Sequence, residues 1–507
     1  MKFFRQPEKL LLIAILLIAA FFRLYKVPEY IVFLGDEGRD LIVVRNILKG
    51  DLTLLGPTAS VGGFYLGPIY YYMMAPFLLL FNYNPAGPAY LVSLFGIATV
   101  YLVYLFGKRF FHPIVGLVAA FLYAISPLIV RYSRASWNPN PLSFFALGGI
   151  FILSLGLTKK RRLYLYLAGA CLGVAWQLHY LALILTAVYT AILSQITTRK
   201  KWLDLKFSSQ RIKEFFRHNL IVFLGFVTTF SPFLLFEIRH LFPNTKTVIE
   251  FMTRQDGALD TPFLAIFTTA YERISRLFIE ALSLPRSPFL IGVVLVAFLS
   301  LFYASRRRNK SLLIWLVVGI LSMSVYQGDI HDYYFGFLFP VPFLMVGITA
   351  YLLWIKGWGA KIIVALGLII LTGSFIDKAF FSRPPNNLIR QTELAAEVVL
   401  DLSGGEPYNF ALMSTGNSDH AYRYFLETSA NPPKKLEEEV TPQLILICEQ
   451  DPATCQPLSF PSWEVAGFGR REVVETRTAP PGLITVIKTV HHESSLDMIG
   501  KPAPKGS

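Results

Sequence analysis

The sequence predicts a polytopic α-helical membrane protein with a small C-terminal α/β domain. Three observations lead to this prediction. Of the 507 residues, 54% are hydrophobic and only 16% are charged, whereas soluble chains carry about 25% charged residues. The mean hydropathy is +0.50. The apolar residues form repeated long runs of the kind that cross a bilayer, and the composition becomes polar only from about residue 380.

The apolar runs predict about eleven membrane spans. The first run, residues 10–22, lacks a small-residue cleavage site after it, so we expect a retained span rather than a signal peptide. The expected spans lie near residues 9–25, 86–107, 113–130, 139–158, 163–179, 181–196, 219–237, 287–304, 311–326, 334–354 and 361–377.

The basic residues predict how the chain is oriented. With a cytoplasmic N-terminus, every compact basic cluster falls in an inner loop, as the positive-inside rule requires. These clusters are Lys108–Arg109, Lys159–Arg162, Arg199–Lys201 with residues 211–217, Arg306–Lys310, and Lys356 with Lys361. An odd number of spans then places the C-terminal domain outside the plasma (inner) membrane. Because topology accounts for the formal charge of +14, we expect no nucleic-acid partner.

The expected domain organisation follows from these spans. Residues 1–379 form the membrane domain, 380–490 an extracytoplasmic α/β domain and 491–507 a disordered tail. Two outer segments, 26–85 and 238–286, are longer than simple links. The first contains an amphipathic stretch, 37–49, which predicts a helix in the membrane interface that Gly50 closes. Its apolar positions are Leu41, Val44, Ile47 and Leu48.

The C-terminal domain combines strand-like and helix-like segments. Strands are expected at residues 409–414, 443–448 and 483–488, and helices at 393–402 and 419–427. Cys448 and Cys455 lie close together in this polar region. A disulfide between them is expected if the domain faces an oxidising compartment.

The first candidate site is the acidic run that follows the first span, Gly35-Asp36-Glu37-Gly38-Arg39-Asp40. Carboxylates in a partly dry pocket can act as general bases. A structural alternative is equally concrete. Asp36 can be the N-cap of the interfacial helix, with Glu37 favoured by the helix dipole.

The second candidate is Arg131 with Arg134, at the outer end of the third span. Two arginines three residues apart can grip a phosphate through charge-assisted hydrogen bonds. The neighbouring Tyr132 and Trp137 are also typical anchors at a membrane interface, so anchoring remains the alternative.

Three further polar patches lie at outer span ends: residues 327–334 with His331 and Tyr333, His179 with its neighbours, and Arg239 beside Glu237 and His240. One histidine beside acids is weak evidence for a metal, and a hydrogen-bonding site for a polar head group is an equally good interpretation. Because polar residues at span ends are costly without a cavity, five such patches on one face predict one outward-facing site. No phosphate-binding loop, dinucleotide fingerprint or His-Glu-x-x-His motif is present.

The sequence resembles the GT-C class of glycosyltransferases, and in particular the protein O-mannosyltransferases and the bacterial lipid A aminoarabinose transferases. The resemblance covers roughly the first 200 residues. The matching residues are Asp36-Glu37, Gly67-Pro68-Ile69-Tyr70-Tyr71-Tyr72 and Ser126-Pro127.

The resemblance implies sugar transfer from a polyprenyl-phosphate donor, dissolved in membrane lipid, to an unknown acceptor on the outer face. It implies that Asp36 deprotonates or orients the acceptor hydroxyl, while Glu37 positions nearby groups. Basic residues would hold the departing phosphate. The first candidates are Arg131 and Arg134, followed by His331 and Arg239. Tyr70, His179 and Tyr333 are further candidates for substrate binding. A divalent cation stays open as a cofactor.

The chain departs from the family at two places. Relatives carry an acidic residue where this chain has Trp137-Asn138-Pro139-Asn140, so Asn138 is expected to contact the acceptor through its amide. The lysine that usually precedes the Pro-containing stretch is replaced by Gly67-Pro68. The competing interpretation is a transporter or flippase for a lipid-linked glycan, but no internal repeat is found and charges within spans are nearly absent. A non-catalytic scaffold would leave the polar clustering unexplained.

Overall fold

The computed structural model describes residues 5–59, 63–195, 209–254, 263–326, 330–451 and 454–503, which form two compact units. The first unit comprises Met1–Val27, Leu52–Phe77 and Pro88–Pro384, and the second Pro28–Asp51, Leu78–Gly87 and Pro385–Ser507. The expected boundary near residue 380 is therefore close to the observed one. The second unit, however, also takes in much of the first expected outer segment.

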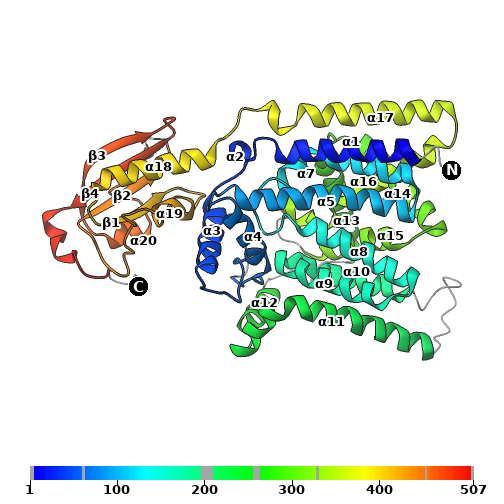
Figure 1. Ribbon diagram of the computed structural model, residues 1–507, viewed down its shortest axis with the longest axis horizontal. Helices are drawn as coiled ribbons and strands as arrows, with labels where there is room; N and C mark the ends of the chain where they lie inside the picture. The colour runs from blue at the N-terminus through cyan, green and yellow to red at the C-terminus, as the bar shows by residue number, and fades with distance from the viewer. Residues whose placement is uncertain are drawn as a thin grey trace. The chain divides into compact units, whose positions relative to one another are not determined.

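The first unit is a bundle of helices (Figure 1). Its helices are α1 (Arg5–Leu24), α4 (Ile69–Leu80), α5 (Gly87–Phe110), α6 (Pro113–Ile125), α7 (Pro127–Tyr132), α8 (Leu142–Lys159), α9 (Arg162–Leu178), α10 (Leu183–Ser194), α11 (Ser209–Arg239), α12 (Pro243–Arg254), α13 (Phe263–Leu282), α14 (Phe289–Arg307), α15 (Ser311–Val325), α16 (Pro340–Trp354) and α17 (Trp358–Asp377). Three 3-10 helices join them: η1 (Tyr180–Ala182), η2 (Asp332–Leu338) and η3 (Phe380–Ser382).

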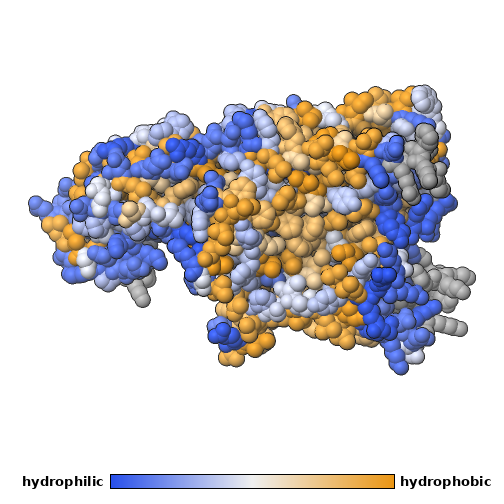
Figure 2. Space-filling model, viewed as in Figure 1, coloured by the Kyte–Doolittle hydropathy of each residue, from blue (hydrophilic) through white to orange (hydrophobic). Residues whose placement is uncertain are grey.

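Every segment expected to span the membrane contains helix. By length and composition, 5 of the helices among the described residues can cross a membrane, or 6 if η2 and α16, bent by 58°, form one span. The count of about eleven spans therefore stays a prediction. Helices α12 and α13 lie in the second expected outer segment, where none was predicted. Figure 2 shows a broad hydrophobic surface over the bundle, with hydrophilic residues gathered at the end where the chain begins.

Small residues let the helices of this bundle pack closely. Helix α9 packs against α8 and α11. A Cβ atom at Gly169 would lie 1.9 Å from the carbonyl oxygen of Val222, and one at Gly225 would lie 1.9 Å from that of Tyr166. Backbones approach in this way where membrane helices associate through small residues. The glycines therefore set the spacing of α9 and α11.

Two breaks in the helices lie near the candidate residues. The expected span 113–130 is divided into α6 and α7 at Ser126, because Pro127 cannot continue the hydrogen-bond ladder. The hydroxyl of Ser126 donates to the carbonyl oxygen of Ala281 at 2.7 Å. Helices α9 and α10 are separated by His179 and the single turn η1.

The second unit is built on a four-stranded sheet. Its strands are β1 (Tyr408–Met413), β2 (Gln443–Cys448), β3 (Arg471–Ala479) and β4 (Ile484–His491), in the order β1-β2-β4-β3. Its helices are α2 (Val27–Tyr30), α3 (Gly35–Leu48), α18 (Leu388–Ser403), α19 (His420–Leu426), α20 (Trp463–Gly467) and the 3-10 helix η5 (Glu493–Met498). Strands β1 and β2 pair in parallel, and β4 is antiparallel to both of its neighbours.

Apolar side chains cover both faces of the sheet. One cluster joins the sheet to α18 through Val399 and Leu402, and the other lies beneath α20 and includes Val465 and Phe468. Three of the four strands and both major helices agree with the predicted segments. Strand β3 was not predicted, because nearly all of its residues are exposed and no apolar alternation marks it.

Two further features of the second unit bear on the predictions. Cys448 and Cys455 form a disulfide. The tail expected to be disordered from residue 491 is ordered as far as it is described: His491 ends β4, η5 follows, and the amide of Gly500 donates to the carbonyl oxygen of Val440 at 2.9 Å. Backbone pairing with the domain gives this polar segment its structure.

Helix α3 corresponds to the predicted amphipathic stretch, and Gly50 follows its end with a φ of 101°. Leu41, Val44 and Ile47 are buried as the apolar spacing indicated. The helix packs against α19 within the second unit. Its apolar face therefore contributes to the packing of this unit, while its place in the membrane interface stays a prediction.

Candidate functional site

The start of α3 assigns the capping role to Glu37. The helix begins at Gly35 and Leu34 is its N-cap. The Leu34 amide donates to Oε2 of Glu37 at 3.0 Å, as the third residue of a capping box does. Asp36 lies inside the first turn. The structure thus removes the simplest structural alternative for Asp36, which was the N-cap itself.

Glu37 is a buried acid. Burial is the main cause that raises its pKa from 4.5 to about 7; the negative charges of Asp36 and Asp40 act in the same direction, and hydrogen bonds from the backbone amides of Leu34 and Glu37 oppose it. A carboxyl group with a pKa near neutrality can exchange protons at physiological pH. Glu37 is therefore chemically distinct from its neighbour, although both carry the same functional group.

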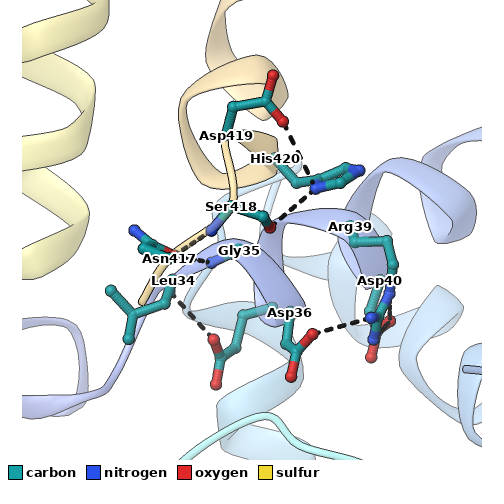
Figure 3. A network of polar contacts seen from close by, with 10 residues as sticks. Leu34, Gly35, Asp36, Arg39, Asp40, Asn417, Ser418, Asp419 and His420 are labelled. Carbon is teal, nitrogen blue, oxygen red and sulfur yellow. Dashed lines mark hydrogen bonds and ion pairs between the residues drawn. The ribbon is translucent and has the colours of Figure 1, made fainter. Parts of the chain in front are cut away.

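Asp36 is held by an arginine that also binds a second acid. Nη1 of Arg39 lies 2.8 Å from Oδ1 of Asp36, and its Nη2 lies 2.8 Å from Oδ1 of the fully buried Asp40 (Figure 3). The side chain of Asp36 is 55% exposed. Arg39 orients the Asp36 carboxylate and compensates its charge. The arrangement leaves an accessible carboxylate, oriented by an ion pair, at the start of α3.

The C-terminal domain contacts α3 on the opposite side of this first turn (Figure 3). The Gly35 amide donates to Oδ1 of Asn417 at 2.9 Å. A Cβ atom at Gly35 would lie 1.9 Å from Oγ of Ser418, and one at Gly38 would lie 2.4 Å from the Ala421 amide nitrogen. Both glycines are therefore needed for this close approach. Further along α3, Nη2 of Arg45 binds Oε2 of Glu427 at 2.6 Å.

In the first unit, Arg131 and Asp332 form an ion pair at the junction of α7 and η2. The hydroxyl of Tyr132 donates to Oδ1 of the same aspartate at 2.5 Å. The Arg131 side chain is 60% exposed, so its guanidinium remains accessible. The sequence analysis proposed Arg131 and the 327–334 loop as separate candidates. It did not predict that Arg131 pairs with Asp332 in that loop. Residues 327–329 of that loop lie outside the described residues.

Aromatic rings bring three of the predicted patches together. The ring centroid of Tyr333 lies 5.5 Å from that of His331, 5.8 Å from that of His179 and 4.5 Å from that of Trp137. His179 also stacks on Tyr180 at 4.4 Å. Nδ2 of Asn138 donates to the carbonyl oxygen of Leu178 at 2.7 Å, beside this cluster. Asn138 therefore fastens the 135–141 loop to the end of α9.

Arg134 has a different environment from Arg131. It is buried, and its guanidinium donates to the carbonyl oxygens of Phe22 and Tyr25 at 2.8 and 2.7 Å, at the end of α1. Its guanidinium carbon lies 3.9 Å from the ring centroid of Phe380. These contacts satisfy carbonyls that a helix C-terminus leaves unpaired. The two arginines do not form one phosphate clamp, contrary to the prediction.

The remaining candidates lie around the same end of α9. Tyr70 is buried, with its hydroxyl 3.0 Å from Oγ of Ser136. A Cβ atom at Gly67 would lie 2.2 Å from Cγ of Gln177. The backbone at Gly67 therefore packs directly against this side chain. Arg239 is exposed at the end of α11 and no described contact joins it to the aromatic cluster.

The patch that contains Arg239 is nevertheless linked to that cluster through the 63–66 segment. The carboxylate of Glu237 accepts hydrogen bonds from Asn244 and Thr245 at the start of α12. Oδ1 of Asn244 accepts from the Tyr65 amide at 2.8 Å, and the ring of Phe64 lies 6.0 Å from that of Tyr180. Four of the five predicted patches are therefore connected within the first unit.

Sequence reasoning gave no role of their own to three residues that hold these sites, of which Asp40 and Asp332 stood within the predicted patches. Asp332 pairs with Arg131, Asp40 shares Arg39 with Asp36, and Asn417 binds the start of α3. Asp40 stood in the acidic run, but its burial is visible only in the fold. Asn417 is 381 positions beyond Asp36, and no local pattern marks it. Among the described residues, no group of three or more His, Cys, Asp or Glu side chains could hold a metal ion.

Comparisons with known proteins address the fold and the family. Residues 66–209 match the family model described as dolichyl-phosphate-mannose-protein mannosyltransferase. No curated protein sequence matches the chain significantly. Among solved structures, ArnT from Cupriavidus metallidurans bound to undecaprenyl phosphate superposes with a TM-score of 0.61 and 12% identity, covering 94% of this chain and 97% of that one.

A second solved structure is the archaeal oligosaccharyltransferase AglB from Archaeoglobus fulgidus, in complex with an inhibitory peptide and a dolichol-phosphate. It has a TM-score of 0.52 and 14% identity over 84% of this chain. The present chain spans only 64% of the length of AglB. The predicted resemblance to the GT-C glycosyltransferases is thereby confirmed by the family match over residues 66–209, and in fold it extends over most of the chain.

Proposed function

We propose that the chain is a membrane glycosyltransferase that moves a sugar from a polyprenyl-phosphate donor to an acceptor hydroxyl on the outer face of the membrane. The observation that carries this proposal is the fold shared with ArnT over 94% of this chain and 97% of that one. That structure holds undecaprenyl phosphate. The family match to dolichyl-phosphate-mannose-protein mannosyltransferases adds a polyprenyl-phosphate sugar, dolichyl-phosphate mannose, to the support.

In the proposed reaction Asp36 is the general base. It accepts the proton of the acceptor hydroxyl while the acceptor oxygen attacks the anomeric carbon. The bond between that carbon and the phosphate oxygen breaks, and the electron pair leaves with the polyprenyl phosphate. The exposed, arginine-oriented carboxylate of Asp36 suits this role. Glu37, buried beside it, sets the start of α3 through its hydrogen bond to Leu34.

Arg131 is the proposed contact to the donor phosphate. Its guanidinium is accessible and its partner Asp332 is itself shared with Tyr132, so a phosphate can replace one carboxylate oxygen without leaving the aspartate unpaired. Arginine forms strong charge-assisted hydrogen bonds to phosphate. The aromatic cluster of Trp137, His179 and Tyr333 next to it offers flat apolar faces to a sugar ring.

The decisive experiment assays purified full-length protein with radiolabelled polyprenyl-phosphate hexoses and pentoses and a panel of acceptors. We expect Asp36→Asn to lower kcat by about 100-fold or more, since a general base contributes that much. Asp51→Asn removes an exposed carboxylate just beyond α3 and should leave transfer unchanged. Full activity of the Asp36 variant would refute its role.

The same assay tests the donor site. Arg131→Ala should raise the KM for the donor about tenfold or more, because a charge-assisted hydrogen bond is lost, and Arg131→Lys should recover part of it. Movement of intact labelled donor across vesicles, with no sugar transferred to any acceptor, would instead establish the transporter interpretation.

A further inference from the structure

Among the contacts between the C-terminal domain and α3, the one at the start of the helix is made by the turn at residues 414–419, through Asn417. Oδ1 of Asn417 accepts the Gly35 amide at 2.9 Å and its own neighbour's amide, that of Ser418, also at 2.9 Å. Nδ2 of Asn417 donates to Oε1 of Glu449 at 2.9 Å. Both ends of the amide are therefore used, and the carboxamide has one orientation.

Glu449 is in turn fixed to the sheet of the domain. It directly follows β2, and its amide donates to the carbonyl oxygen of Met413 at the end of β1. The hydroxyl of Tyr422 donates to the same Oε1 at 2.8 Å. Its neighbour Cys448 is closed to Cys455 by the disulfide. Asn417 is thus held by a residue, Glu449, that is itself attached to strands β1 and β2.

We propose that Asn417 is a positioning residue through which the C-terminal domain orients Asp36. This inference rests on the proposed function of Asp36. The Gly35 amide precedes Asp36 by one residue, so the hydrogen bond to Asn417 fixes the backbone from which the Asp36 side chain projects. Gly35 and Gly38 lack side chains where α19 approaches, which lets the contact form. The C-terminal domain thereby contributes to catalysis by orienting Asp36.

The physical consequence concerns the chemical step more than substrate affinity. The carboxamide of Asn417 is bonded to the amides of Gly35 and Ser418 and to Glu449, so its proposed effect is on the direction of the Asp36 carboxylate. A misplaced catalytic group lowers the rate because the reactive geometry is populated less often. We therefore expect Asn417→Ala to lower kcat roughly 10- to 100-fold with little change in the KM for the donor.

The test combines kinetics with amide hydrogen exchange on the full-length protein. In Asn417→Ala, exchange in the peptide covering residues 31–41 should rise and kcat should fall. Glu449→Gln keeps an acceptor oxygen for both Asn417 and Tyr422, so it should behave as wild type, whereas Glu449→Ala should behave like Asn417→Ala. The alanine variant of Glu449 also serves if Asn417→Ala does not fold.

Asn431→Ala is the matched control. Asn431 belongs to the same domain, and its Nδ2 binds Ser403 and Glu406 at the end of α18 instead of α3. It should change neither readout. Unchanged exchange at residues 31–41 in Asn417→Ala would overturn the positioning role, and so would an unchanged kcat when Asp36→Asn is inactive. If Asp36→Asn remains active, the proposed function fails, while the exchange measurement still decides whether Asn417 orders α3.

Discussion

At the scale of single residues, two adjacent acids have acquired different properties. Asp36 is exposed and paired with Arg39, whereas Glu37 is buried and has a pKa of about 7. Burial costs a charged group its hydration, so Glu37 favours the neutral form. Because the pKa of Glu37 is higher in the folded than in the unfolded chain, folding takes up a proton between the two values.

This difference predicts a pH-dependent stability. The contribution of Glu37 is fully present below its unfolded pKa of 4.5 and is lost as the pH rises to about 7, a change of roughly 3 kcal/mol. Glu37→Gln keeps an oxygen that can accept the Leu34 amide but cannot ionise. Thermal unfolding should therefore show that the variant is more stable than wild type at pH 8, with the difference disappearing near pH 4.

Glu437→Gln provides the comparison, because Glu437 is an exposed glutamate of the same unit. It should melt like wild type at both pH values. An equal pH response of wild type and Glu37→Gln would show that Glu37 is not the titrating group.

At the scale of elements, the spacing of α9 and α11 depends on glycine. The carbonyl oxygen of Val222 occupies the space that a side chain at Gly169 would need, and a backbone carbonyl cannot rotate away as a side chain can. Overpacking a rigid interface typically costs about 1–3 kcal/mol. Helices α9 and α11 can therefore pack at this spacing only if position 169 has no side chain.

Gly169→Leu should accordingly lower the melting temperature of the purified protein by several degrees and reduce the yield of folded protein. Gly367→Leu is the control: Gly367 lies in α17, and its Cβ would meet nothing within 4 Å. Leucine there should be tolerated. If both variants melt alike, the close approach of α9 and α11 does not limit stability.

At the scale of the whole molecule, the second unit assembles segments from distant parts of the chain. Residues 28–51, which carry α3, and residues 385–507 form one compact body. A compact body of this kind cannot be divided by a bilayer. Helix α3 and the C-terminal domain must therefore lie on the same side of the membrane. The positions of the basic clusters predict that this is the outer side.

Cysteine labelling tests the side. In a background where the free Cys171 is replaced by serine, a membrane-impermeant maleimide added from outside should label Lys435→Cys in the C-terminal domain. It should not label Lys160→Cys, in the basic turn between α8 and α9. Labelling of Lys160→Cys from outside would reverse the predicted topology.

The sequence by itself determined the elements whose signals are local. Long apolar runs marked the helices of the bundle, short apolar runs within the polar C-terminal region marked β1, β2 and β4, and spacing marked the buried face of α3. The Asp36-Glu37 and Gly67-Pro68 motifs indicated the family. These features rest on hydrophobicity and short-range spacing, which a chain displays before it folds. Strand β3 escaped because it is an exposed edge without such a signal.

Only the tertiary structure decided which residues act together. It gave the cap of α3 to Glu37, separated the buried Arg134 from the accessible Arg131, and placed Asn417 against Gly35 across 382 positions of sequence. It also packed the apolar face of α3 against α19 in the second unit. Burial and pairing depend on which surfaces meet, and surfaces far apart in sequence meet only in the folded chain.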